Sequence, residues 1–428
     1  EPMKIRTSSK PLGGTLIVCI LTTAIIGMTL ASYLDLTGAQ NQSTLRSLAW
    51  NSTVPVLEAG IEEALTHLYY NGGTNLSSEG WSSYDGQFVK WRAVGDGWAY
   101  VAISNSSAPV IYARGYKRVP LRNGQWLTRY VRVETRKDGL FNRGLVAKSQ
   151  VTLNGNNALV DSFDSADPNY SSNGVYDASK RKANGTVASN SSITNAIVTG
   201  NANIFGRTAT GPGGTVRVGP NGAVGDMAWQ AGSTNGIQPG HNASDMNVSF
   251  PDVKLPFSGG SFTPGGGAGY EFVISSSGNY EVSAINGGLL VKSNVNAVLV
   301  VDGNINLTGS DKIQIEPGGS LQLYMLGSSA KIGGNGVINQ NGNATNFFYW
   351  GLPSNTTLTV SGNGSFTGVI YAPNADFTLN GSGGGENITG VSVTGTARLN
   401  GNFEFHYDEA LSRLGYNRGY IVTSWNEI

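Results

Sequence analysis

The chain has almost no cysteine, little charge and no excess of either sign of charge. Cys19 is the single cysteine in 428 residues, which excludes a disulfide scaffold and a cysteine-ligated structural zinc site. The 28 basic side chains equal the 28 acidic ones in number. This balance argues against a nucleic-acid binder, because neutralising phosphates requires a basic excess. Charged residues make up only 13% of the chain, which is about half their usual share.

Glycine and β-forming residues are abundant instead. The chain contains 60 glycines without a G-x-y period, so it is not collagen-like. Its 39% of hydrophobic residues separate it from chains that stay disordered. The length allows two or three domains. The composition predicts a mainly β protein with glycine- and asparagine-rich turns, and it does not favour an enzyme.

The amino-terminal region carries a long apolar run. The segment 15–36 has twenty apolar or small polar residues before its first acid, Asp35, which is enough for a helix to cross about 30 Å of hydrocarbon. Lys4, Arg6 and Lys10 precede it, and this asymmetry predicts a cytoplasmic amino end and an exported remainder. A cleaved signal peptide is the alternative, but the run exceeds the usual 7 to 15 residues and the helical pattern continues beyond it.

That continuation is amphipathic and runs from about Ala39 to Tyr70. Apolar residues recur at three- and four-residue steps and end before Asn71-Gly72-Gly73, which is typical of a helix terminus. Pro55 lies within this stripe and is expected to kink the helix. The apolar positions are Leu45, Leu48, Ala49, Val56, Leu57, Gly60, Ile61, Ala64, Leu65 and Leu68.

The order of basic leader, Gly13-Gly14, apolar stretch and amphipathic continuation resembles a type IV pilin precursor. The stretch 57–65, LEAGIEEAL, is similar to the signature of PilX-type minor pilins. The resemblance implies that a prepilin peptidase cuts after Gly14 and leaves Thr15 as the new terminus. It also implies that the pilus assembly machinery takes the protein from the inner membrane into a filament whose axis the helices form. The sequence departs from the major pilins at Cys19, where they carry glutamate. The assembly helix would use Leu16, Ile17, Val18, Cys19, Ile20, Leu21, Ile25, Ile26, Pro55 and Glu58.

Residues 81–150 alternate in polarity with a period of two, which predicts a small antiparallel sheet in the region 73–150. The resemblance to pilins implies that this sheet packs on the long helix. Basic side chains concentrate between Arg114 and Lys148, against only Glu134 and Asp138 in that interval. They form either a surface for an anionic partner or subunit, or a solvated strand face.

The remaining chain is expected to hold an irregular β-rich region with early β-helix coils at 151–256, a β-helix at 257–408 and a carboxy-terminal cap at 409–428. Short strands separated by Gly/Asn turns recur from Tyr270 onward. Their apolar positions return at intervals of roughly 15–22 residues, which favours a solenoid over a β-sandwich. The stretches GVIYAPNA (368–375) and HYDEAL (406–411) resemble marks of a carboxy-terminal module of unknown function in large bacterial pilin-like proteins. That resemblance implies a right-handed parallel β-helix.

Candidate binding and catalytic groups are sparse. Four aspartates in an Asn/Ser-rich stretch could offer oxygen ligands to calcium, although they lack the EF-hand spacing and otherwise suit turns; they are Asp161, Asp164, Asp167 and Asp177. His406 with Asp408 is the one pair resembling acid–base machinery, and it lacks a nearby nucleophile. No cofactor or resident metal is expected.

The sequence therefore predicts a mainly β protein with a long amino-terminal helix, acting as a structural subunit of a type IV pilus-like filament or pseudopilus of a bacterium. The leader spans 1–14, the helix 15–72, and the β-helix is displayed outside the cell. One alternative is a membrane-anchored surface adhesin whose β-helix binds glycans. Another is a secreted polysaccharide lyase or hydrolase, although no two carboxylates recur at the repeat spacing on one face.

Overall fold

The computed structural model describes residues 12–71, 76–120, 124–156, 158–232, 234–362, 365–381 and 386–428. These form two compact units, Glu1–Lys137 with Gly419–Ile428, and Asp138–Arg418. The chain is mainly β, with a long amino-terminal helix and a small antiparallel sheet, which confirms this part of the predicted fold class.

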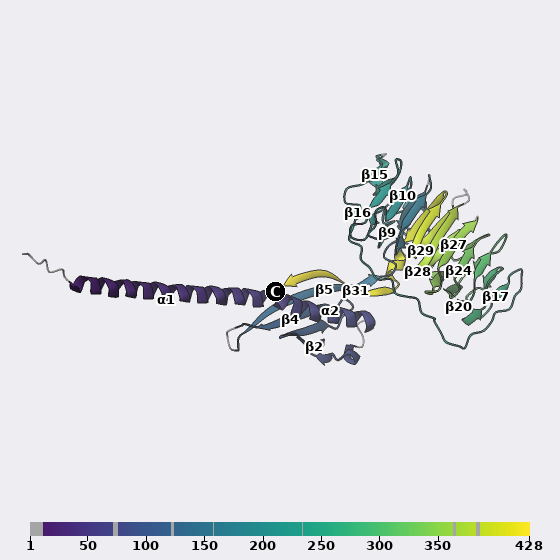
Figure 1. Cartoon of the computed structure of the whole chain (residues 1–428). Helices are drawn as coiled ribbons and strands as arrows, with labels where there is room; N and C mark the ends of the chain where they lie inside the picture. The colour runs from purple at the N-terminus through teal and green to yellow at the C-terminus, as the bar shows by residue number, and fades with distance from the viewer. Residues whose placement is uncertain are drawn as a thin grey trace, which may run out of the picture. The chain divides into compact units, whose positions relative to one another are not determined.

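The helical segment of the first unit consists of α1 (Leu12–Asn51) and α2 (Thr53–Asn71), which follow one another with a single break at Ser52 (Figure 1). Pro55 lies in the first turn of α2, where a proline needs no backbone N–H. Within the described residues, one helical run is long and apolar enough to cross a membrane, Gly14–Tyr70. Its 57 residues measure about 85 Å at 1.5 Å per residue, nearly three times the thickness of a hydrocarbon core.

The small sheet has six strands, in the order β1-β2-β3-β4-β5-β31. One of its faces packs on α2, because Leu57, Ile61 and Leu68 interlock with Val101 and Ile111 in one buried cluster. A 3-10 turn, η1 (Leu76–Glu79), precedes the sheet. The strands are β1 (Ser82–Tyr84), β2 (Gln87–Val94), β3 (Gly97–Ser104), β4 (Val110–Arg118), β5 (Trp126–Gly139) and β31 (Asn417–Glu427).

The carboxy terminus differs from the predicted cap at 409–428. A 3-10 helix, η4 (Glu409–Arg413), forms where a capping helix was expected, but the chain then adds β31 to the edge of the small sheet beside β5. The boundary predicted at 150 also shifts, since the second unit begins at Asp138. The bond from Ile428 N to Tyr130 O (3.1 Å) shows how far back along the chain the partner of β31 lies, so local patterning gives no sign of it.

The second unit is one 25-stranded sheet whose pairs are parallel. Its first half comprises β6 (Leu145–Ala147), β7 (Val151–Asn154), β8 (Leu159–Phe163), β9 (Val187–Ser189), β10 (Ile197–Gly200), β11 (Asn203–Phe205), β12 (Thr208–Ala209), β13 (Val216–Val218), β14 (Ala223–Gly225), β15 (Gly236–Ile237) and β16 (Asn242–Ala243), with η2 (Ala178–Lys180) and α3 (Met227–Ala231) between them.

Its second half comprises β17 (Phe272–Ile274), β18 (Gly278–Val282), β19 (Leu289–Val291), β20 (Asn296–Val301), β21 (Ile305–Leu307), β22 (Ile313–Ile315), β23 (Ser320–Met325), β24 (Ser329–Ile332), β25 (Val337–Asn339), β26 (Phe347–Gly351), β27 (Thr357–Gly362), β28 (Phe366–Gly381), β29 (Glu386–Asn400) and β30 (Phe403–Asp408), with η3 (Ala344–Asn346) before β26.

Most pairs in this sheet join strands that are two or three places apart along the chain, although β14 pairs with β15, and β27, β28 and β29 each pair with the next strand. β19 pairs with β22 and β22 with β25, while β20 pairs with β23 and β23 with β26. The step along the chain from a residue to its partner is not constant. It is shorter from Phe272 to Leu289 than from Leu289 to Ile313, and longer again from Ser329 to Thr357. The repeats are therefore more variable in length than the sequence suggested, and their inward residues join in one continuous core.

The stacking order of this unit is not the order of the sequence. β29 pairs with β28 on one side and with β6 and β7 on the other, and β30 pairs with β8. In the order of pairing, β6 therefore lies in the middle of this sheet, which is called the stack below. From β6 the chain runs to one end of the stack at β16, and it crosses to the other end at β17 before it returns to the middle (Figure 1). The crossing segment, 244–271, is tied to the stack by bonds such as Tyr371 Oη to Pro251 O (2.8 Å) and Val248 N to Asn190 Oδ1 (2.9 Å).

Candidate functional site

The apolar half of α1 carries eight of the ten assembly residues that the sequence singled out, and all eight are exposed. Leu16 is 64% accessible and Ile20 60%, and Cys19 is a free exposed thiol. This exposed set also includes Ile17, Val18, Leu21, Ile25 and Ile26. No residue of the most apolar stretch of the helix is covered by the rest of the described chain. A surface this apolar requires lipid or other protein chains around it.

Threonine hydroxyls within the apolar segment are bonded to the helix backbone. Thr22 Oγ1 donates to Val18 O (2.9 Å), Thr23 Oγ1 to Cys19 O (2.6 Å) and Thr29 Oγ1 to Ile25 O (3.0 Å). Because each hydroxyl is already satisfied by the preceding turn, it does not oppose transfer of the helix into an apolar environment. These three hydroxyls of the apolar segment are therefore bonded within the helix itself.

The other assembly residues lie in α2, where the helix changes role. Val56, Leu57 and Gly60 face the small sheet and are buried, while Pro55 and Glu58 are exposed on the opposite side. The α2 end of the long helix thus packs on the small sheet of its own unit, whereas the apolar end in α1 is not covered by the rest of the described chain. Gly14 and Thr15, the proposed processing residues, both lie within α1, whereas Lys4, Arg6 and Lys10 of the predicted leader lie outside the described residues.

The four aspartates considered as calcium ligands are not brought together. Asp164 accepts two hydrogen bonds from Arg413 (3.0 and 2.6 Å), which are the main reason that its pKa is lowered. Asp177 caps η2 and accepts from Ser172 and Ser179, which together lower its pKa to about 2. Asp167 caps its own turn. Among the described residues, no cluster of three or more His, Cys, Asp or Glu side chains is arranged to hold a metal ion.

Asp161 belongs to a different group, which lies where the two halves of the stack meet. It stands directly opposite His406 in the pairing of β8 with β30, and both side chains are essentially inaccessible. His406 Nδ1 donates to Asp161 Oδ1 (2.7 Å), and Tyr176 Oη donates to Asp161 Oδ2 (2.7 Å). The tyrosine ring also stacks on the imidazole at 3.5 Å between centroids.

His406 therefore pairs with Asp161 and not with Asp408, the neighbour that the sequence suggested. Asp408 instead accepts from Ser165 N (3.0 Å) and Ala410 N (3.1 Å), and burial raises its pKa. Burial and the bond to Asp161 raise the pKa of Tyr176 in the same way. The second imidazole nitrogen lies 3.4 Å from Glu404. Sequence reasoning missed Asp161 as the partner because the two residues lie near opposite ends of this unit's sequence and no local signal links them.

Further polar contacts extend across this junction. Lys182 and Ser162 both bond to Glu409, and Asn154 Nδ2 donates to Asn400 Oδ1 (3.0 Å). Every one of these pairs joins the segment that opens the unit to the segment that closes it. The cluster is arranged to hold the two halves of the stack together.

The comparisons with known proteins bear on the second half of the stack. Residues 270–414 match the model of a family described as a domain of unknown function (DUF7305). This range begins just before β17 and ends just after η4, so it covers one half of the stack and stops short of the small sheet and helix. Neither the curated proteins nor the solved structures contain a match to the chain.

Proposed function

We propose that this protein is a structural subunit of a type IV pilus-like extracellular filament or pseudopilus, assembled through α1. The observation that carries the proposal is the divided helix: α2 is buried on its own sheet, while the apolar part of α1 is exposed over its whole circumference. Copies leaving a membrane would bury these surfaces against one another. The length of the helix supports this, because the membrane needs only about 20 of its residues.

In this proposal the second unit is a right-handed parallel β-helix displayed from the filament. Its support is the pairing of strands two or three places apart in parallel register, which is the pattern of successive turns of a solenoid. Parallel strands joined within one sheet take the right-handed crossover in nearly all cases. The role is non-catalytic: the chain provides self-association and a rigid surface, and its partners are further copies, a prepilin peptidase and an assembly apparatus.

The first experiment determines the amino terminus of protein sheared from cell surfaces. Mass spectrometry should find Thr15 as the first residue, and electron microscopy of the same fraction should show filaments that bind antibody against the β unit. Protein that remains entirely in the membrane fraction with residues 1–14 intact would contradict the proposal and favour a permanently anchored adhesin.

A pair of glycine variants separates processing from folding. A Cβ at Gly14 would meet no atom within 4 Å, and the same is true at Gly38, so neither substitution disturbs the unit. Gly14→Leu should retain the leader and remove the filaments, whereas Gly38→Ala should leave both unchanged. Filaments of normal abundance from Gly14→Leu would show that cleavage at this position is not required.

A further inference from the structure

The small sheet carries an aligned aromatic and arginine row on the face that α2 does not cover. Trp91 lies opposite Tyr100, Tyr100 opposite Arg114, and Arg114 opposite Tyr130. These four residues therefore form one straight row across β2, β3, β4 and β5. The rings of Trp91 and Tyr100 are 4.9 Å apart between centroids. Cross-strand neighbours at this spacing hold one another's side chains in place.

Arg114 lies at the centre of this row with its charge uncompensated. Its guanidinium carbon is 5.0 Å from the centroid of Tyr130 and 5.9 Å from that of Tyr100, so the two rings hold it from both sides. Two neighbours on β5 have carboxylate partners, Arg129 with Glu427 and Arg132 with Glu134. Arg114 has no ion pair in the part of the chain that the structure describes, and it is exposed.

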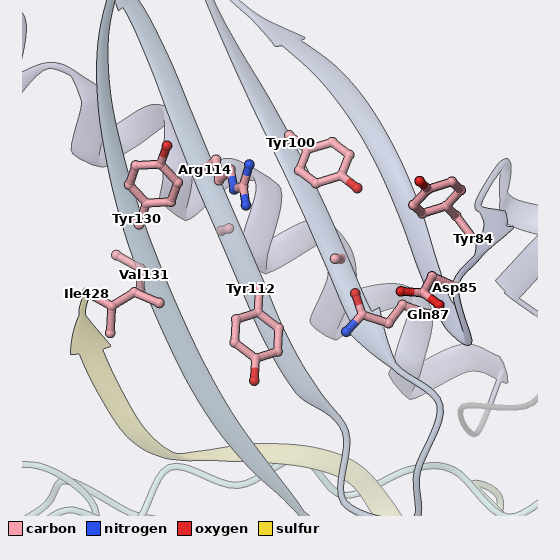
Figure 2. A pocket seen from close by; sticks show the side chains of 11 residues that line it. Tyr84, Asp85, Gln87, Tyr100, Tyr112, Arg114, Tyr130, Val131 and Ile428 are labelled. Carbon is pink, nitrogen blue, oxygen red and sulfur yellow. The ribbon is translucent and has the colours of Figure 1, made fainter.

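A pocket of about 300 Å³ opens beside this arginine (Figure 2). Tyr84, Asp85 and Gln87 line one side of it, while Val131 and Ile428 lie across from them. Asp85 is held at the tip of the β1–β2 hairpin, where it and Gly86 have φ of 50° and 72°, as a two-residue turn requires. No side-chain hydrogen bond engages Asp85 or Gln87 within the described residues, so their polar groups are available.

We propose that this pocket binds an acidic saccharide, with a uronic acid unit seated on Tyr100 and Tyr112. Arg114 would take the carboxylate in a bidentate fork, because its planar guanidinium is already oriented by the two flanking rings. The aromatic rings offer flat apolar area to the C–H face of the sugar ring. Asp85 accepts and Gln87 both donates and accepts, which suits the hydroxyl groups of a sugar.

The charge distribution distinguishes this ligand from single-stranded nucleic acid, which aromatic and arginine-rich sheets also bind. A nucleic-acid groove follows the phosphate backbone with a series of uncompensated cations. Here the pocket has one unpaired arginine at one side and a carboxylate, Asp85, at the other, which repels phosphate. Within the pocket, one sugar ring with a single carboxylate and several hydroxyls matches that arrangement, whereas a segment of single-stranded DNA offers phosphates without free ring hydroxyls.

The test uses the full-length protein in detergent micelles, with binding followed by isothermal titration calorimetry. The probes are trigalacturonate, a neutral cello-oligosaccharide of equal length, oligothymidylate and oligoglutamate. Trigalacturonate should bind, with an affinity that falls as salt rises. The Arg114→Gln variant should weaken it at least tenfold, and Tyr100→Leu should weaken it by a similar factor.

Arg118→Gln is the matched control. Arg118 is exposed and stacks at 5.0 Å on Trp126, as Arg114 does on Tyr130, but it does not line the pocket. Trigalacturonate binding should be unchanged in this variant. Equal losses in both arginine variants, or equal binding of oligoglutamate, would reduce the site to a nonspecific basic surface and overturn the proposal. Tighter binding of oligothymidylate, or no binding of trigalacturonate, would overturn it as well.

Discussion

At the scale of single residues, Glu63 joins α2 to the sheet through two cations of β2. Its carboxylate lies 3.0 Å from Lys90 Nζ and 2.9 Å from Arg92 Nη1. Burial raises the pKa of Glu63, but hydrogen bonds from Lys90 and Arg92 lower it by more, so that it lies below its ordinary value. A carboxyl whose folded-state pKa is depressed stabilises the fold above its unfolded pKa and loses that contribution as the pH falls through the folded one.

We therefore expect Glu63→Gln to lower the free energy of unfolding of the helix-and-sheet unit by about 1 kcal/mol at pH 7, the upper end for a solvent-screened ion pair. The difference from the parent should begin to shrink below about pH 4, near the ordinary pKa of glutamate, and disappear once the pH falls below the lowered pKa of Glu63 in the folded protein. Denaturant unfolding as a function of pH measures this. Glu62→Gln is the control, because Glu62 is exposed and has no ion pair among the described residues. A difference of the same size at pH 7 and at pH 3 would contradict the assignment.

The buried pair of Asp161 and His406 is expected to be strongly coupled. Replacing the histidine with phenylalanine would leave an inaccessible carboxylate with Tyr176 as its remaining partner, which costs about 3 kcal/mol or more. Adding Asp161→Asn should recover part of that loss, because it removes the charge. Chemical unfolding of both single variants and the double variant measures the coupling. Strictly additive losses would show that the two side chains do not stabilise each other.

The residues that sequence reasoning identified well are those whose role depends on local pattern. The apolar residues of α1 and the buried stripe of α2 follow from spacing alone, because a helix places residues three and four apart on one face. The partners of Asp161 and Asp164 could not be predicted, because His406 and Arg413 lie at the far end of the unit's sequence. The same holds for Arg114, whose alternation with tyrosines is visible in the sequence but whose position between two rings depends on strand register.

At the scale of elements, the contact of α2 with the sheet depends on the absence of side chains at two glycines. A Cβ at Gly60 would lie 2.7 Å from Val101 Cγ2 and 3.1 Å from Ala99 Cβ. A Cβ at Gly115, on β4, would lie 2.9 Å from Leu57 Cγ. The helix can approach the sheet this closely only because glycine, which has no side chain, occupies these positions in α2 and in β4.

Gly60→Ala should accordingly destabilise this unit by about 1–3 kcal/mol, the usual cost of overpacking, even though alanine is the better helix former. Gly38→Ala is the matched change in open space and should be neutral or slightly stabilising. Thermal unfolding of both variants decides between the two effects. If Gly60→Ala were as stable as Gly38→Ala, the close packing of α2 on β3 would be wrong.

Elements also show where the pattern of the sequence was sufficient and where it was not. Short strands from Tyr270 onward were predicted from alternation and turn residues, and the structure has β17 to β30 in this part of the chain. The order in which the strands pair could not be predicted from the sequence. β29 is one of the last strands of the unit, but it pairs with β6 and β7, which are the first. β31 was missed as a strand because a terminal segment following a capping helix has no neighbouring strand to suggest its partner.

At the scale of the whole chain, the second unit begins and ends at one place. Leu140 N donates to Tyr416 O (2.9 Å), so the chain leaves this unit beside the point where it entered. This follows from entry in the middle of the stack, because the first and last strands of the unit are then neighbours. The small sheet uses strands from both sides of this excursion, since β5 precedes it and β31 follows it. An insertion with adjacent ends leaves its host able to fold.

We therefore expect a shortened protein, in which a short glycine-rich linker replaces residues 140–416, to fold its helix and small sheet. Circular dichroism and a cooperative thermal transition in detergent micelles would show this. The control is the same shortened chain ending before the linker, at Gly139. It lacks β31, so it exposes the edge of β5 and loses the partner of Arg129, and it should aggregate or unfold at lower temperature. Equal stability of the two chains would mean that β31 contributes nothing to the sheet, whereas failure of both would mean that the small unit depends on the β stack for its folding.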